Sequence, residues 1–156
     1  NPAIARQHCD AALQAATDTY KRGNAAFVLA ESGDITRAET LAARIAKESP
    51  SDTQVNSIFL PVIRASLHLQ RGEAARALDA SELALPYDKS NVGMYSRLLR
   101  GRAYLELRKP ADAAAEFKAI LDQRDNLLNY PIKPVALVGL ARVYAAGGKS
   151  ASVSVA

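Results

Sequence analysis

Cysteine, tryptophan and histidine are nearly absent from this chain of 156 residues, which has one Cys, no Trp and two His. A lone Cys9 can form no intramolecular disulfide and leaves no cysteine-based zinc site. His8 and His68 belong to no HExxH motif and to no i, i+4 ligand pair, so we expect no metal and no cofactor. An activated thiol at Cys9 is disfavoured as well, because adjacent helical residues such as His8 and Cys9 point in different directions.

Long apolar runs and catalytic signatures are missing too. The longest run, residues 58–63, is interrupted by Pro61 and is far shorter than the roughly 20 residues that span a bilayer. No phosphate-binding GxxxxGK[ST], GxGxxG, EF-hand or GxSxG pattern occurs. Acidic pairs such as Asp112 and Glu116 have the spacing of neighbours on one helix face, where we expect ordinary solvated ion pairs. We therefore expect that the chain is not an enzyme and that residues 1–156 do not insert into a membrane.

Charge and aromatic content exclude a nucleic-acid binder. Twenty Lys and Arg against sixteen Asp and Glu give a net charge of +4, with the two signs interspersed along the chain. The nine Tyr and Phe fall mainly at positions expected to pack between helices, not among basic residues as strand-binding proteins require. Since 49% of the residues are hydrophobic, the composition is typical of a single globular domain, residues 1–156.

Apolar residues recur at helical spacing almost throughout the chain, which predicts an all-α fold. Gly and Pro punctuate this pattern, for example at Gly33-Asp34, Arg71-Gly72 and Lys109-Pro110. Pro110 suits a first helical turn, and Pro61 should kink or start its helix. We expect helices at 3–16, 18–32, 35–48, 54–70, 73–85, 92–108, 110–123, 133–146 and from 150 onward.

The helices repeat as hairpins, most clearly through Gly101, Tyr104, Ala113 and Phe117. Here a small residue permits close helix approach, an aromatic fills the hairpin, a second small residue sits at the crossing, and Phe117 packs onto the next hairpin. Crossing residues lie 39, 36 and 40 residues apart, at Ala38, Ala77, Ala113 and Val153. This pattern resembles the tetratricopeptide (TPR) repeat, which implies a right-handed α-α superhelix. We expect hairpins at 18–48, 54–85, 92–123 and 133–156, the last truncated, preceded by the helix at 3–16.

A closer resemblance covers most of the chain. The segments concerned are GDITRA (33–38), LPVIRA (60–65), PY (86–87), RGRAYL (100–105), EFKAILD (116–122) and GLARVYAAGG (139–148). They are similar to the carboxy-terminal TPR region of eukaryotic-like serine/threonine protein kinases of acidobacteria. The resemblance implies a docking region of a larger bacterial signalling protein, whereas the kinase signatures themselves are absent. The compartment stays open: extracytoplasmic if a membrane span precedes this region, and otherwise cytoplasmic.

Partner binding is expected on the concave face, which the first helix of each TPR hairpin lines. His68 takes the place of the usual buried aromatic, so we expect it to be a hydrogen-bonded packing residue. The groove would combine apolar and aromatic anchors with two arginines and suit a protein or peptide that has apolar side chains and an acidic group. The candidate binding residues are Tyr20, Asn24, Phe27, Phe59, Ile63, Ser66, Tyr95, Leu98, Arg102, Glu106, Val138 and Arg142.

Three alternatives stay open. Self-association through the end helices, 3–16 and 150–156, would give a homodimer or scaffold. A regulatory sensor would hold a small anionic ligand between Arg102 and Arg142. Each groove residue can also be explained by packing on a neighbouring helix, and each arginine by an ion pair with a nearby carboxylate.

Overall fold

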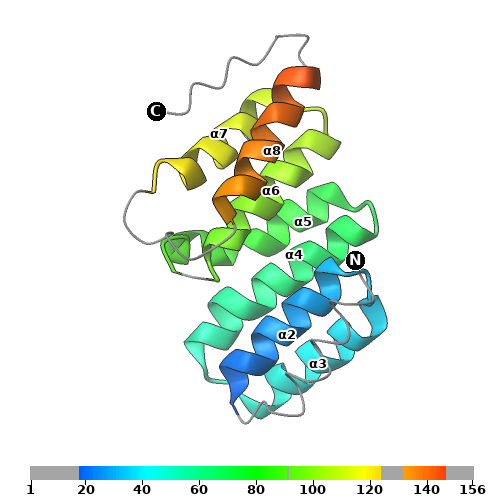
Figure 1. Ribbon diagram of the computed structural model, residues 1–156. Coiled ribbons are helices and arrows are strands. Elements are labelled where there is room, and N and C mark those ends of the chain that lie inside the picture. Colours follow the sequence, from blue (N-terminus) through cyan, green and yellow to red (C-terminus); the bar gives the residue numbers. More distant parts are fainter. Residues whose placement is uncertain (1–17, 91, 124–131, 147–156) are drawn as a thin grey trace.

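The chain is described by a computed structural model over residues 18–90, 92–123 and 132–146. Within these ranges it contains seven α-helices, a π-helical turn and a 3₁₀ helix, and no strand (Figure 1). The predicted all-α fold is confirmed. The predicted helices at 3–16 and from 150 onward, and the crossing residue Val153, lie outside the described residues. The elements are α2 (Thr19–Glu31), α3 (Ile35–Glu48), η1 (Val55–Phe59), α4 (Leu60–Gln70), α5 (Ala74–Ser81), η2 (Glu82–Tyr87), α6 (Met94–Glu106), α7 (Pro110–Leu121) and α8 (Ile132–Ala146).

Three of the connections share one turn geometry. A residue with positive φ lies two positions after the last residue of α2, α4 and α6; these residues are Gly33 (79°), Gly72 (72°) and Arg108 (57°). In each case the next residue donates its N–H to a carbonyl five residues back, for example Asp34 to Leu29 at 2.9 Å. This is the Schellman ending, which satisfies otherwise orphaned carbonyls of the last helical turn. Equivalent helices therefore end in equivalent ways, at the breaks that the sequence predicts.

Proline explains the two places where a predicted helix is divided. The single helix expected at 54–70 consists of η1 followed by α4, with Pro61 as the second residue of α4. Proline has no N–H, and its ring clashes with the carbonyl four residues earlier, so the backbone ahead of it widens into a π-turn. The helix expected at 73–85 ends earlier, at Ser81, and continues as the 3₁₀ helix η2 that contains Pro86. Pro110 begins α7, as predicted.

Helices pack in antiparallel pairs that follow one another along the molecule (Figure 1). The pairs are α2–α3, α4–α5 and α6–α7, and α8 packs against α7 and α6. Along one side, α2 contacts α4, α4 contacts α6, and α6 contacts α8. The predicted crossing residues Ala38, Ala77 and Ala113 are all fully buried. The buried apolar residues form two clusters, one from α2 to α6 and one from α6, α7 and α8. Tyr95 of α6 packs against both clusters, so the core continues through the described residues.

Phe117 joins α6, α7 and α8. Its ring is fully buried, and a Cβ placed on Gly101 of α6 or on Gly139 of α8 would lie 2.5 Å from a ring carbon. No side chain larger than hydrogen fits at either position without displacing the ring. The prediction that Phe117 packs onto the element after its own hairpin is confirmed for α8, and the ring also fills the space beside Gly101 of α6.

Candidate functional site

The twelve candidate groove residues do not share one environment. Tyr20, Glu106, Val138 and Arg142 are exposed, and Asn24, Tyr95 and Arg102 are partly buried. The remaining five are buried: Phe27, Phe59, Ile63, Ser66 and Leu98. The predicted surface is therefore divided into a part that the protein itself fills and a part that stays open.

The filled part lies over α4. The ring of Phe27 on α2 reaches the ring of Tyr95 on α6, with ring centroids 4.8 Å apart. Phe59 is 1% exposed because its ring lies against Gly23 and meets the edge of Tyr20, with centroids 5.4 Å apart. The expectation that Phe27 and Phe59 face an open groove is therefore corrected: both are packing residues.

Ile63 and Ser66 of α4 require the same correction, since both are fully buried. Ile63 belongs to the hydrophobic cluster formed by α2 to α6. The hydroxyl of Ser66 donates a 2.6 Å hydrogen bond to Oε1 of Glu31. Neither side chain is available to a partner in this arrangement.

Arg102 takes part in an ion pair that links the first hairpin to the third. Its Nη1 donates to both carboxylate oxygens of Glu31, at 3.0 and 2.8 Å. Since Ser66 also bonds to Glu31, the residues Glu31, Ser66 and Arg102 connect α2, α4 and α6. We call this ion pair and the Phe27–Tyr95 contact the closed cluster. An ion pair with a carboxylate is one explanation of Arg102 that the sequence leaves open, and in the structure this carboxylate comes from a residue 71 positions away.

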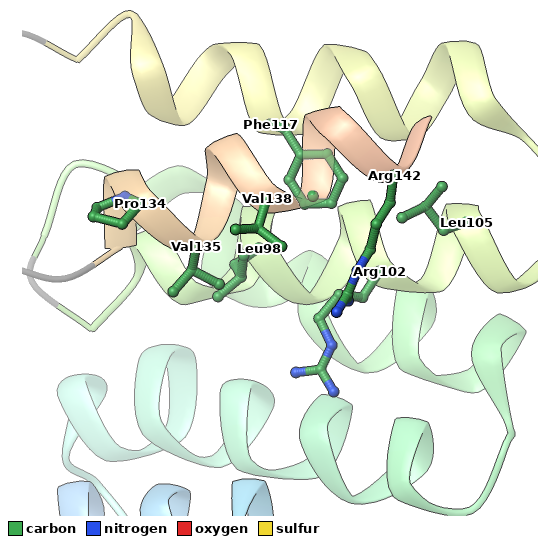
Figure 2. Close-up of a pocket in the computed structure, with 9 residues that line it drawn as sticks. Leu98, Arg102, Leu105, Phe117, Pro134, Val135, Val138 and Arg142 are labelled. Atoms are coloured by element: carbon green, nitrogen blue, oxygen red, sulfur yellow. The ribbon is translucent and has the colours of Figure 1, made fainter. Parts of the chain in front are cut away.

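An open cleft of about 260 Å³ lies between α6 and α8. Its walls are mostly apolar, and Figure 2 shows Leu98, Val135 and Val138 on one side, with Arg102 and Arg142 extending toward the other. Val135 and Val138 are 46% and 52% exposed, so part of the apolar wall of the cleft is open to solvent. We refer to this site as the α6–α8 cleft; its lining residues are Leu98, Arg102, Leu105, Phe117, Pro134, Val135, Val138, Gly139 and Arg142.

The two arginines of the cleft differ in their bonding. Arg102 already holds Glu31, whereas Arg142 is exposed and forms no ion pair within the described residues. A guanidinium presents five N–H donors in a planar fork that matches a carboxylate. Arg142 is therefore the cleft's available anion-binding group, next to the apolar surface of Val138.

The rear of α6 is anchored by a second network. Glu116 of α7 accepts from Nη1 of Arg97 at 3.0 Å and from Nε of Arg100 at 2.7 Å. Arg97 also pairs with Asp88, and Arg100 donates to the hydroxyl of Tyr104 at 3.1 Å. Burial alone would lower the pKa of Arg97, but the hydrogen bonds to Asp88 and Glu116 and the negative charges of these two carboxylates together outweigh burial and raise that pKa. The expectation of a solvated ion pair at Glu116 is wrong, because the residue is only 9% exposed.

His68 forms the side-chain hydrogen bond that is predicted from the sequence. Its Nδ1 lies 2.6 Å from Oε2 of Glu73, across the turn between α4 and α5. This hydrogen bond is the main reason why the pKa of Glu73 lies below its ordinary value of 4.5. No three or more His, Cys, Asp or Glu side chains in the part of the chain described here are placed to hold a metal ion. None of its helices is long and apolar enough to cross a membrane.

Part of the cleft is not predicted from the sequence. Leu105, Pro134 and Gly139 were not expected to line it, and Phe117 was identified only for its packing role. Pro134 and Gly139 give no periodic signal of exposure, since a proline in a first turn and a helical glycine are ordinarily interpreted as structural.

Comparison with protein families, with curated proteins and with solved structures finds no match.

Proposed function

We propose that this chain is a TPR-type repeat domain whose hairpins form a right-handed superhelix. Three features support the proposal. Equivalent helices end in the same Schellman turn, the first helices contact one another in succession, and Phe117 packs between glycines of consecutive hairpins. Repeated units that pack each on the next are typical of a solenoid.

We further propose that the domain is a non-catalytic binding module of a larger bacterial signalling protein. Its site is the α6–α8 cleft, and its partner is a protein segment that supplies an apolar side chain and one carboxylate. A single observation carries this proposal: half-exposed Val138 lies beside Arg142, which has no ion pair within the described residues. Burying an apolar side chain there gives affinity, and a charge-assisted hydrogen bond to Arg142 gives orientation.

The two-arginine anion sensor has less support. Arg102 donates to both oxygens of Glu31, so a small anion would have to displace that carboxylate before both arginines could hold it. A protein segment needs only Arg142 and can use the apolar wall, which a small polar ligand would leave uncovered. The geometry therefore favours a segment with mixed chemistry.

A random-peptide display selection tests the proposal. The wild-type chain is compared with the double variant Val138→Asp, Arg142→Gln, which alters only exposed side chains of α8. The control is Leu83→Asp, Arg64→Gln, which makes the same kinds of change at exposed positions outside the cleft. We expect peptides that bind the wild type and the control but not the cleft variant. Failure to enrich any peptide, or equal binding to all three proteins, would refute a cleft-binding function.

A further inference from the structure

The closed cluster provides an internal example of what the concave face binds. Helix α2 supplies Phe27 and, four residues later, Glu31. Helix α6 supplies their partners Tyr95 and Arg102, seven residues apart, with the rings 4.8 Å and the ion pair 2.8 Å apart. One ring and one carboxylate at i and i+4 on a helix thus fill the concave face above α4.

One repeat later, α8 keeps the groups that α6 contributes, but α4 lacks the ring and the carboxylate that α2 contributes. Val135 and Arg142 lie 40 residues after Tyr95 and Arg102, and they retain an apolar side chain and a guanidinium. The positions 39 residues after Phe27 and Glu31 are Ser66 and Gln70, which offer neither an aromatic ring nor a charge. The hydroxyl of Ser66 is already bonded to Glu31, and Gln70 is exposed. Helix α4 therefore cannot do for α8 what α2 does for α6.

This difference explains why the α6–α8 cleft is open. Val135 and Val138 stay about half exposed, at 46% and 52%, because no ring from α4 covers them. Arg142 has no ion pair in the described part of the chain, since the position that corresponds to Glu31 carries an amide. Helix α8 thus carries an apolar side chain and a guanidinium, as α6 does in the closed cluster. The ring and the carboxylate that α2 supplies there have no counterpart on α4.

We infer that the partner of the cleft is a helix with a large apolar side chain at position i and Asp or Glu at position i+4. This inference rests on the proposed function and names the partner's chemistry. Residues four apart lie on one face of a helix, so both groups can reach the cleft together. The apolar side chain packs on Val135 and Val138, and the carboxylate accepts hydrogen bonds from Arg142. One acidic group suffices, because Arg102 keeps Glu31.

A helical probe peptide tests this motif directly. The probe is a fluorescein-labelled peptide of 17 residues based on Ala and Lys, long enough to be helical, with one Phe and a Glu four residues later. Its controls carry Gln in place of Glu, or Glu and Phe in reversed order. With the wild-type chain, fluorescence anisotropy should show at least about tenfold weaker binding of both controls, as expected when a charge-assisted hydrogen bond is lost.

Variants of the chain identify the site of binding. Arg142→Gln should weaken the probe by about tenfold, whereas Arg64→Gln, an exposed arginine outside the cleft, should not. Gln70→Glu should also weaken binding of the probe, because the new carboxylate on α4 would compete with the Glu of the probe for Arg142. Gln54→Glu introduces the same charge at another exposed position and should have no effect.

The outcomes separate this inference from the proposed function. Equal affinity for the Glu and Gln probes, or full binding to Arg142→Gln, would overturn the motif. Cleft-dependent display peptides without an apolar residue and an acid at i and i+4 would also overturn the motif and leave the binding function intact. A display selection with no cleft-dependent peptide would overturn both.

Discussion

Replacing Gly139 with Ala tests the packing that positions α8 and hence the cleft. In an ordinary helix this change stabilises the protein by about 1 kcal/mol, because Gly has a lower helix propensity than Ala. Here the added Cβ would lie 2.5 Å from the ring of Phe117. The ring cannot retreat, since Gly101 contacts it equally closely from α6. Overpacking of this kind costs about 1–3 kcal/mol, so we expect a net loss of about 1 kcal/mol.

Urea unfolding followed by far-UV circular dichroism measures this loss as a lower midpoint with an unchanged m-value. The matched control is Ala141→Gly, at an exposed position of the same helix, which measures the propensity contribution alone. In a Phe117→Leu background the ring is gone, and Gly139→Ala should then stabilise the protein. Stabilisation by Gly139→Ala in the wild-type background, of the size that Ala141→Gly removes, would refute the reasoning.

Further predictions concern the turns and the ion pairs. Arg108→Gly should stabilise the chain by about 1 kcal/mol in urea unfolding, because only glycine adopts a positive φ without strain, and Gly72→Ala should destabilise it by a similar amount. A lowered pKa means that Glu73 favours the ionised form in the folded state. Its stabilisation is therefore present above pH 4.5 and is lost as the pH falls through its lowered pKa. Glu73→Gln should flatten the fall in urea midpoint below pH 4.5, and an unchanged acid profile would contradict the role of the His68 hydrogen bond. Glu116→Gln should cost about 2–3 kcal/mol in urea unfolding, because two guanidiniums lose a buried carboxylate, and a change below about 0.5 kcal/mol would contradict this account.

Much of the fold is predictable because its determinants are local. The turn at Gly72 follows from glycine's tolerance of positive φ, and Pro110 begins a helix because its missing N–H costs nothing there. The π-turn before Pro61 is harder to predict from the sequence, since proline can kink a helix, start it or widen the turn that precedes it. The local sequence also does not show that Phe59, the last residue of the π-turn, packs against Gly23, because this contact joins residues 36 positions apart.

The candidate site was only half predictable for a related reason. Periodicity predicts that Phe27 and Arg102 lie on the same side of the helix stack, but it does not give the angle between successive hairpins. That angle decides whether α2 and α6 come close enough for Phe27 to reach Tyr95 and for Glu31 to reach Arg102. Contacts between residues 68 and 71 positions apart therefore required the three-dimensional arrangement.

The contrast between the closed cluster and the open cleft has an energetic consequence for binding. The floor of the cleft is held in place by Phe117, and Glu116 ties two arginines of α6 to α7. Because α6 is fixed on its rear face, a partner need not order that helix on association, and less of its binding energy is lost to reorganisation. The closed cluster likewise holds Arg102 in an ion pair and leaves Arg142, which forms none within the described residues, for the acidic group of the proposed partner. Under the proposed function, a short segment with one apolar side chain and one carboxylate is therefore the simplest ligand that completes this surface.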